Sequence, residues 1–369
     1  MSKSFDVCIR GDGVVGRTLA LLLARERLSV ALVARPPLPP VGPAKTDVRA
    51  YALNSASRKV LEALRVWPEA PFVTPVREMQ VWGDDGGQVN FSADSVGEQA
   101  LAWIVDVPAL EQQLIQAVRY QAQVELVEAP VKAALNVICE GRQSSSRDEF
   151  GVRWTVKPYP QKAIAARLNS DRAHAGVARQ WFSGGDILAL LPLSGTAGNS
   201  VALVWSVSVE RASQLEKLTP EEFCSTLQAV CGQEAGNLTL SSERASWPLA
   251  LSNADHWVGA GWALAGDAAH TIHPLSGQGL NLGLADTVCL AGVLAKREYW
   301  RALGDEKLLR RYERARKADV ATMGAVTDGL HGLFAQTDGP WQLLRNWGMK
   351  GFARSGLLKH WMVRQAAGL

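Results

Sequence analysis

The apolar residues near the start of the chain follow two different spacings. Residues 5–9 form a short apolar run, residues 14–24 carry apolar side chains at helical intervals, and residues 29–34 form a second apolar run. Short apolar runs are typical of buried strands, whereas apolar residues at i, i+3 and i+4 are typical of an amphipathic helix. The pattern therefore predicts a βαβ unit at the N-terminus.

Helical spacing returns in two places in the middle of the chain. It predicts helices at 52–64, with Asn54 or Ser55 as N-cap, and at 108–120. A capping box with proline at the first helical position predicts that another helix begins after Thr219.

Strand-like runs fill most of the remaining middle of the chain. Residues 78–95 alternate around Gly86-Gly87, which indicates a hairpin. Further short runs separated by turn residues predict strands at 152–156, 163–168, 187–193 and 201–209.

The end of the chain returns to the first pattern. A strand at 262–265 leads into a glycine-rich loop and a helix at about 281–295, and the sequence beyond Trp300 is helical in pattern. The predicted fold class is therefore α/β with an α+β insert: a Rossmann-like nucleotide-binding domain, an inserted antiparallel-sheet domain and a helical C-terminal region. The expected boundaries are 1–75, 101–150 and 256–300 for the first, 76–100 and 151–255 for the second, and 301–369 for the third.

Composition narrows the class of protein. With 369 residues, 47% hydrophobic and 20% charged, the chain is long enough for one large α/β unit or two joined domains and too apolar for wholesale disorder. A net charge of +3 without a dense Lys/Arg block argues against nucleic-acid binding. Thirteen tryptophans favour packing first and the lining of an aromatic substrate pocket second.

Cysteine use and hydropathy bear on the compartment. The five cysteines include no CxxC pair, which argues against a disulfide framework and a zinc site and for a reducing, cytoplasmic environment. No cluster of His, Asp and Glu has metal spacing, so we expect no metal. There is no run of 18 apolar residues, so we expect no membrane span.

The first strand leads directly into Gly11-x-Gly13-x-x-Gly16. In a dinucleotide-binding turn the first glycine allows the tight turn, the second lets the backbone approach a pyrophosphate, and the third allows helix and strand to pack closely. The N–H groups and dipole of the following helix then attract the phosphates. An ordinary glycine-rich βα turn is the alternative. The acidic residue expected at the end of the second strand is replaced by Ala34, which predicts either that Arg35 contacts a phosphate instead or that the adenosine end is bound weakly.

An arginine just before the helix at 52–64 is a second candidate. Arg49 lies two residues after Asp47 and faces the nucleotide crevice of the predicted domain. Its fork of donors suits a pyrophosphate. On this segment alone, a surface ion pair between Asp47 and Arg49 explains the pattern equally well.

The segment from Gly266 to Asp286 is the most specific one. Asp267 ends a predicted parallel strand, where such sheets bind ligands, and its carboxylate can accept hydrogen bonds from ribityl hydroxyls. The loop that follows directs backbone N–H groups inward at the start of the next helix, which suits the electron-rich edge of a reduced flavin. Its predicted contacts with the cofactor are Pro274, Gly277, Gly279, Leu280 and Asn281. No catalytic side chain is predicted; Pro274, Gly277, Gln278 and Gly279 are expected nearest the isoalloxazine.

These three segments, in this order, resemble the p-hydroxybenzoate-hydroxylase-type FAD monooxygenases. The details Asp47-x-Arg49-x-x-Ala52-Leu53 and His273-Pro274-Leu-x-Gly-Gln-Gly-Leu-Asn281 are most similar to the ubiquinone-biosynthesis hydroxylases of that family. Weaker likeness continues at Ile104-Val-Asp106, Gln180-Trp-Phe182, Leu191-Pro192-Leu193 and Trp247-Pro248-Leu249. The resemblance implies FAD, NAD(P)H as donor and O₂. It also implies a flavin C4a-hydroperoxide that hydroxylates an electron-rich ring, with a polyprenylated phenol as substrate class.

The sequence departs from the family pattern in three places. Ala34 replaces the ribose-binding acid, and residues 124–138 are short for the strands that the family places there. The family's Asp-Gly motif is replaced by Glu140-Gly141 within a loop that extends to Arg147. These departures keep two alternatives open: a degenerate homologue that serves as a non-catalytic subunit of a biosynthetic complex, and an FAD dehydrogenase or oxidase.

Two further features have two interpretations each. The glycine-rich loop between the strand at 262–265 and the helix at about 281–295 is called the flavin loop below. His270 and His273 flank it, and for both a structural hydrogen-bonding role is favoured over acid–base catalysis. Residues 340–369 contain five Lys or Arg and no acid, with apolar residues interleaved. This segment predicts either peripheral association with an anionic membrane surface or biosynthetic complex, or a helix that packs on its own protein.

Overall fold

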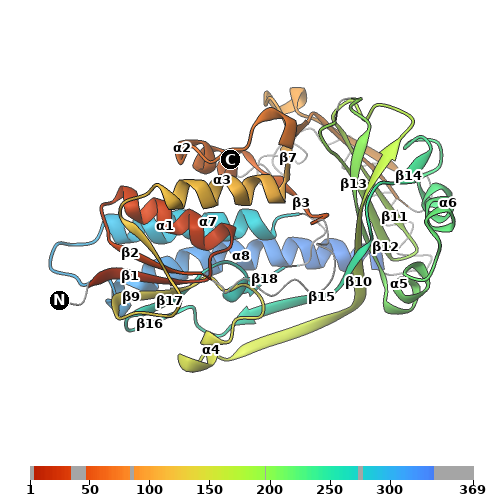
Figure 1. Ribbon diagram of the computed structural model, residues 1–369. Helices are drawn as coiled ribbons and strands as arrows, with labels where there is room; N and C mark the ends of the chain where they lie inside the picture. The colour runs from red at the N-terminus through yellow and green to blue at the C-terminus, as the bar shows by residue number, and fades with distance from the viewer. Residues whose placement is uncertain (1–3, 35–46, 84–86, 196, 273–276, 336–369) are drawn as a thin grey trace.

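The computed structural model describes residues 4–34, 47–83, 87–195, 197–272 and 277–335, and it confirms the predicted α/β fold class. A parallel sheet, an antiparallel sheet and a short connecting sheet lie along one axis of the molecule (Figure 1). All five cysteines are free thiols.

The parallel sheet has six strands in the order β16-β17-β9-β1-β2-β8, and only the β16–β17 pair is antiparallel. The strands are β1 (Phe5–Arg10), β2 (Val30–Val33), β8 (Val124–Val127), β9 (Ala133–Ile138), β16 (Val258–Gly259) and β17 (Trp262–Leu264). Residues 124–138 supply two strands, and both belong to this sheet. Val7, Cys8 and Ile9 in β1 are fully buried, as expected of a central parallel strand that is covered on both faces.

Four helices pack side by side along this sheet in the order α3, α1, α7, α8 (Figure 1). Their bounds are α1 (Val14–Arg25), α3 (Val107–Arg119), α7 (Gly279–Ala295) and α8 (Glu306–Ala335). Leu19 and Leu23 of α1 are fully buried in the core that the helices share with the sheet. Among the described helices, none combines the length and the apolar character that crossing a membrane requires.

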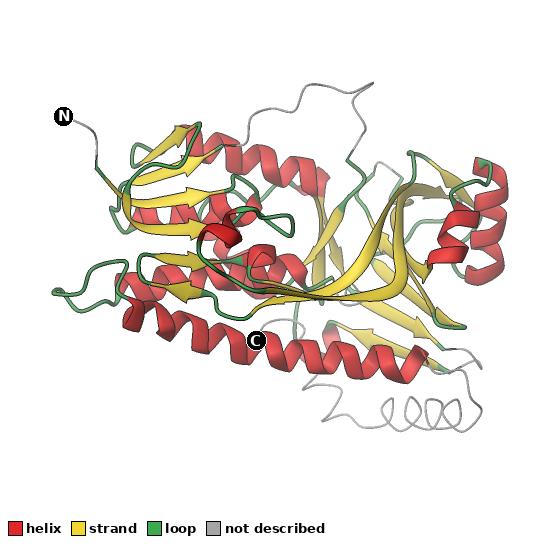
Figure 2. Cartoon of the chain, turned by 90° about the horizontal axis from the view of Figure 1, so that it is seen from below, coloured by secondary structure: helices red, strands yellow, loops and turns green. Residues whose placement is uncertain are grey.

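The second sheet has nine strands and one parallel pair, β5–β11. The strands are β5 (Glu78–Trp82), β6 (Gln88–Ser92), β10 (Trp154–Ser170), β11 (Val177–Ser183), β12 (Asp186–Pro192), β13 (Ser200–Ser208), β14 (Leu238–Leu240), β15 (Ala245–Ala254) and β18 (His270–Thr271). Two helices, α5 (Val209–Leu215) and α6 (Pro220–Cys231), cover the side that faces away from the parallel sheet (Figure 1, Figure 2). The capping box at Thr219 is confirmed.

The long strand β10 corrects one expectation. We expected separate strands at 152–156 and 163–168, because Pro158 and Pro160 interrupt the apolar pattern. The structure has a single strand of 17 residues, with a register shift against β15 between Pro158 and Lys162. A proline at an irregularity removes a donor that the ladder does not use there, so the strand continues.

A three-stranded sheet joins the two large sheets. It consists of β3 (Ala50–Leu53), β7 (Ala102–Asp106) and β4 (Val73–Val76), in the order β3-β7-β4. The helix α2 (Ser55–Ala63) follows β3, and the Asn54 side chain caps it by accepting from the Ser57 N–H at 2.9 Å. The predicted helix at 52–64 therefore begins later than expected, because its first residues complete β3.

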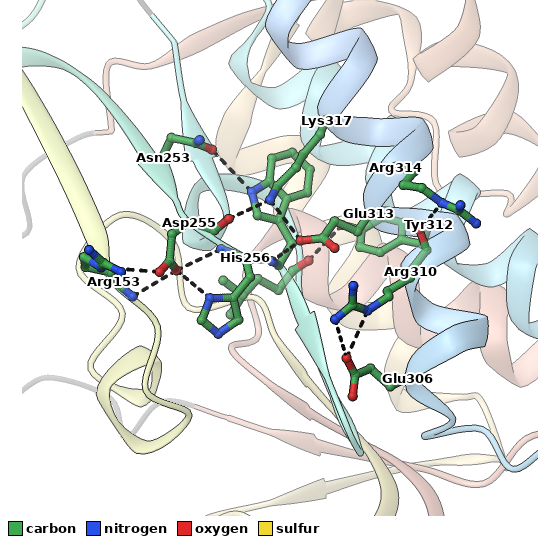
Figure 3. Close-up of polar contacts among 12 residues, drawn as sticks. Arg153, Asn253, Asp255, His256, Glu306, Arg310, Tyr312, Glu313, Arg314 and Lys317 are labelled. Carbon is green, nitrogen blue, oxygen red and sulfur yellow. Dashed lines mark hydrogen bonds and ion pairs between the residues drawn. The ribbon is translucent and has the colours of Figure 1, made fainter.

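The long helix α8 is fastened to the segment that leads into β17 (Figure 3). Glu313 accepts from the Trp257 N–H at 2.8 Å, and Lys317 donates to the Asp255 carbonyl at 2.7 Å. Asp255 in turn receives the Arg153 N–H at 3.1 Å, at the start of β10. These contacts fix α8 relative to the strand that ends at the flavin loop.

Candidate cofactor and substrate site

The turn after β1 has the geometry that its three glycines predict. Gly11 has φ +108°, and a Cβ on it would lie 2.5 Å from the Cys139 carbonyl oxygen. A Cβ on Gly16 would lie 1.9 Å from the Gly11 carbonyl oxygen, so only glycine lets α1 approach β1 this closely. A Cβ on Gly13 would meet nothing within 4 Å. Gly13 is the N-cap of α1 and offers no side-chain cap, so the first N–H groups of the helix are available to an anion.

The adenosine end of the predicted site has no carboxylate at the position where one is expected. Ala34 follows β2, and its N–H donates to the Val127 carbonyl at 3.0 Å. Arg35, the predicted substitute, lies outside the described residues, so its role stays a prediction.

Arg49 is held by Asp47. Its Nε and Nη2 donate to the Asp47 carboxylate at 2.9 and 2.6 Å, and Glu111 lies 3.8 Å from Nη2. The hydrogen bond to Asp47 is the largest cause that raises the pKa of Arg49. The side chain is exposed and the Tyr51 hydroxyl lies 3.5 Å from Nη1. The structure thus shows the surface ion pair, and contact with a pyrophosphate stays a prediction.

Asp267 lies where the first turn, β17 and α7 converge. It sits in the three-residue turn η3 (Gly266–Ala268), and Gly266 has φ +63°. Val15 of α1 packs against this turn: Cβ atoms built on Gly266 and Gly283 would lie 3.2 and 2.9 Å from its Cγ2. The Asp267 side chain is open to solvent. The protein around it raises its carboxyl pKa by limiting hydration, an effect that nearby His270 opposes. This is the environment of a carboxylate in an open recess.

The N-terminus of α7 supplies the second set of free donors. Gly277 has φ +60°, and the helix begins at Gly279 without a side-chain cap. The N–H groups of Gly279, Leu280 and Asn281 belong to the first turn of the helix, whose donors have no partner within the helix. Pro274 and His273 lie outside the described residues.

The Asn281 side chain forms a contact that the sequence analysis did not anticipate. Its Oδ1 accepts from the Ser57 hydroxyl at 2.7 Å and the Asn54 N–H at 3.1 Å, while its Nδ2 donates to the Ala52 carbonyl at 2.9 Å. The amide therefore joins α7 to β3 and α2, and only the backbone of this residue remains for a cofactor. Sequence reasoning missed this contact because its partners lie more than two hundred residues away.

A buried charged network lies behind Asp267. Asp286 on α7 is fully buried; it accepts from the Gly266 N–H at 2.9 Å, from His270 Nε2 at 2.8 Å and from Arg316 Nε at 2.7 Å. Burial works to raise the pKa of Asp286, but His270 and Arg316 outweigh it and hold the pKa below its usual range. His270 is itself buried and stacks on Trp257 with ring centroids 4.8 Å apart, which agrees with the structural role expected for it. The signal available in the sequence was Asp286, an acidic residue among the apolar residues of the helix predicted at about 281–295.

The loop after β9 closes on itself. Glu140 accepts from the Ser144 hydroxyl at 2.6 Å and the Ser146 hydroxyl at 2.8 Å. Arg147, in the short helix α4 (Ser146–Glu149), donates to the Ala268 carbonyl at 3.2 Å. The loop is therefore ordered around its own carboxylate and reaches the turn that carries Asp267.

The nine-stranded sheet turns two different faces to its surroundings, because side chains alternate along each strand. One cross-strand row, which we call the inner row, consists of Ala165, Val204, Ala189, Gln180 and Val81. Ala178 and Ala202 point to the same side and pack against Ile104 of β7. Ala189 and Val204 stay only half-buried although they lie in mid-sheet. The middle of the inner row is thus partly accessible, whereas Ala165 and Gln180 are buried.

This face is connected to the flavin loop. Ala52 packs at the edge of the same apolar cluster as Ile104. A Cβ built on Gly277 would lie 3.4 Å from the Ala52 Cβ. A ring placed between the inner row and α7 would therefore meet an apolar face on one side and the glycine-rich loop on the other.

A separate recess lies elsewhere on the molecule. It has a volume of about 920 Å³ and is lined in part by Pro75, Trp103 and Val177. Each of these residues is the sequence neighbour of one that packs on the inner face: Val76, Ile104 or Ala178. By strand alternation the recess opens on the opposite side of those strands, so we do not assign the substrate to it.

Comparison with known proteins shows the family of the chain. The profile of the FAD binding domain family matches residues 92–326. The chain is 30% identical over 389 residues to 3-demethoxyubiquinol 3-hydroxylase of Escherichia coli, covering 99% of this chain and 98% of that protein. It is 30% identical over 391 residues to ubiquinone hydroxylase UbiL of Rhodospirillum rubrum, covering 99% and 90%.

Solved structures show the same fold. PqsL, a probable FAD-dependent monooxygenase from Pseudomonas aeruginosa, superposes with a TM-score of 0.78 at 22% identity, over 95% of this chain and 100% of that chain. p-Nitrophenol 4-monooxygenase PnpA from Pseudomonas putida superposes with a TM-score of 0.77 at 15% identity, over 100% and 99%.

Proposed function

Because the chain belongs to the FAD-dependent monooxygenase family of ubiquinone biosynthesis, we propose that it hydroxylates the aromatic ring of a quinone precursor. One observation carries the proposal: the turn with the open Asp267 carboxylate packs against α7, whose uncapped start at Gly279 follows Gly277, and a Cβ on Gly277 would lie 3.4 Å from Ala52 at the edge of the apolar cluster on the inner face. We infer that the ring lies between the inner row and the flavin loop, with its substituents directed along the apolar face.

The residues present fit FAD. The first N–H groups of α1, beside Gly13, would hold the pyrophosphate, and Asp267 would accept hydrogen bonds from the ribityl hydroxyls. The N–H groups of Gly279 and Leu280 would face the N1–C2=O edge of the flavin. The space beside Gly13 and Gly279, where a Cβ would meet nothing within 4 Å, fits this placement.

The protein contributes position and environment to the reaction. FAD held by these residues, once reduced by NAD(P)H, would supply the two electrons with which one oxygen atom of O₂ is transferred to the ring and the other is released as water. The helix dipole at Gly279 stabilises negative charge at the flavin edge. The apolar inner row excludes water from the ring. No side chain of the chain is assigned a proton transfer.

The test begins with FAD. Asp267→Ala is expected to leave a folded protein that has lost most of its flavin absorbance, because the ribityl hydroxyls lose their charged acceptor. Far-ultraviolet circular dichroism controls for folding. Full flavin occupancy in this variant would show that Asp267 does not hold the cofactor.

The second part of the test concerns the reaction. The flavin-loaded protein is supplied with NADH or NADPH, O₂ and a short-chain analogue of a demethoxyubiquinol. The expected result is a product with one added oxygen atom, detected by mass spectrometry with ¹⁸O₂. Reduction of the flavin followed only by peroxide release would instead indicate an oxidase, and an absence of flavin binding would indicate the non-catalytic subunit.

The C-terminal segment lies outside the described residues, and its role stays a proposal from sequence. We propose that the basic segment 340–369 associates with an anionic membrane surface. Co-sedimentation with anionic vesicles, weakened by salt, is expected, and charge reversal of Lys350, Arg354 and Lys359 should abolish it. If the protein does not bind anionic vesicles at low salt, the proposal fails.

A further inference from the structure

Two buried groups of opposite charge grip the turn that carries Asp267. On one side, the fully buried Asp286 accepts from the Gly266 N–H at 2.9 Å. On the other side, Arg147, which is 5% exposed, donates from Nη1 to the Ala268 carbonyl at 3.2 Å. The two contacted backbone groups belong to the residues immediately before and after Asp267.

Arg147 is in an unusual position for a cation. Its Nη2 donates to the Arg142 carbonyl at 2.8 Å, and its guanidinium carbon lies 3.8 Å from the centre of the Trp154 ring. Within the described part of the chain it forms no ion pair, and burial lowers its pKa. Withdrawing an unpaired charge from water is costly, so the contacts that it makes with neutral groups have to compensate.

Apolar packing holds the two ends of the turn, through Val15 at Gly266 and through the buried Ala268. One local hydrogen bond closes it, from the N–H of the following residue, Ala269, to the Gly266 carbonyl at 2.8 Å. Gly266 has φ +63°, in the left-handed region, where glycine has wide freedom. The direction of the Asp267 side chain therefore depends on what grips the turn from outside.

We propose that Arg147 and Asp286 are positioning residues that hold the Gly266–Ala268 turn from two sides and thereby aim Asp267 at the ribityl chain of FAD. The inference rests on the proposed role of Asp267. It also gives a function to the loop that departs from the family pattern. Glu140 orders that loop through Ser144 and Ser146, and the ordered loop delivers Arg147 to the turn.

The test is a double-mutant cycle on FAD affinity, measured by titrating apoprotein and following flavin fluorescence. Arg147→Met is expected to raise the FAD dissociation constant about tenfold to a hundredfold, the range for hydrogen bonds to charged groups. The double variant Arg147→Met with Asp267→Ala is expected to bind no more weakly than Asp267→Ala alone, because Arg147 acts through Asp267.

The chain offers a matched control. Arg244 donates to two backbone carbonyls, those of Leu215 and Leu218, at 2.8 and 2.7 Å and lies over the Phe223 ring, but it lies just before β15, beside the helices that cover the nine-stranded sheet. Arg244→Met is expected to lower the stability against urea and leave the FAD dissociation constant unchanged. Arg147→Lys keeps the charge but cannot reach both carbonyls, and it provides the same measurement should Arg147→Met fail to fold.

The possible results distinguish the positioning role of Arg147 from the cofactor-binding role of Asp267. If Asp267→Ala weakens FAD binding and both Arg147 variants do not, the positioning role fails and the proposed function stands. Additive effects in the double variant, or equal effects of Arg147→Met and Arg244→Met, also overturn the positioning role. If Asp267→Ala leaves FAD affinity unchanged, the assignment of Asp267 itself fails, and with it the basis of the inference.

Discussion

Adjacent rows of the nine-stranded sheet differ sharply in side-chain volume. The outer row, on the side covered by α5 and α6, consists of Ile164, Trp205, Leu188, Trp181 and Trp82. Each member is the sequence neighbour of a member of the inner row. Three of the five outer positions are tryptophan, whereas the inner row contains two alanines, two valines and a glutamine.

The two rows are built for different purposes. Trp82 and Trp181 stack with ring centroids 4.8 Å apart, and Trp205 is fully buried beside Phe223. This side is a closed core whose energy comes from buried apolar area. On the other side the small side chains leave space that a ligand can fill. Under the proposed function, this sheet would place its stabilising core on one face and the substrate on the other.

The largest expected effect lies on the outer row. Trp205→Ala should lower the free energy of unfolding by about 3–5 kcal/mol, because it removes the largest fully buried side chain of this face and leaves a cavity. Urea denaturation followed by circular dichroism measures the loss. The folded fraction should retain normal FAD affinity; a loss of FAD affinity would show that the two faces are not separate in function.

A substitution on the inner row should change ligand binding strongly and stability only slightly. Ala189→Phe places a ring into open space at a half-buried position, so stability should change by less than about 1.5 kcal/mol. The binding of a short-chain quinol analogue should weaken by about tenfold or more, as measured by flavin absorbance perturbation. Unchanged analogue binding would remove the inner row from the substrate site.

A third substitution, Ala34→Glu, tests cofactor binding separately from both faces of the sheet. Ala34→Glu restores a carboxylate where the ribose hydroxyls are expected, and a hydrogen bond to a charged group contributes about 1.5–3 kcal/mol. The FAD dissociation constant should fall by about tenfold, with analogue binding unaffected. No change would mean that another group already binds the adenosine end.

The smallest effect is expected at Gln180, the only polar member of the inner row. Its side chain is buried among small apolar residues on a face where an amide can contact a ring oxygen. Gln180→Leu should weaken analogue binding by about fivefold, the value of one neutral hydrogen bond. Gln180→Glu serves as the control that keeps shape and adds charge. Tighter binding by the leucine variant would contradict a polar role for Gln180.

The sequence by itself determined the local features of this protein. Gly11 and Gly16 predicted a close βα turn. The structure confirms it, because a Cβ on either residue would lie only 2.5 or 1.9 Å from a backbone carbonyl oxygen. Asn54 and Thr219 announced helix starts that the structure shows. Gly266-Asp267 announced the end of a parallel strand. In each case the cause lies within a few residues of the signal, because steric limits, capping bonds and periodicity act locally.

Only the tertiary structure decided which distant groups meet. Arg147 reaches Ala268 across 121 positions, and the Asn281 amide reaches Ala52 across 229. Arg316 pairs with Asp286 because α8 packs beside α7. The small side-chain volume of the inner row likewise depends on which strands become neighbours. Such contacts follow from how sheets and helices pack to bury apolar surface, and a local pattern in one segment carries no information about the partner that packing brings to it.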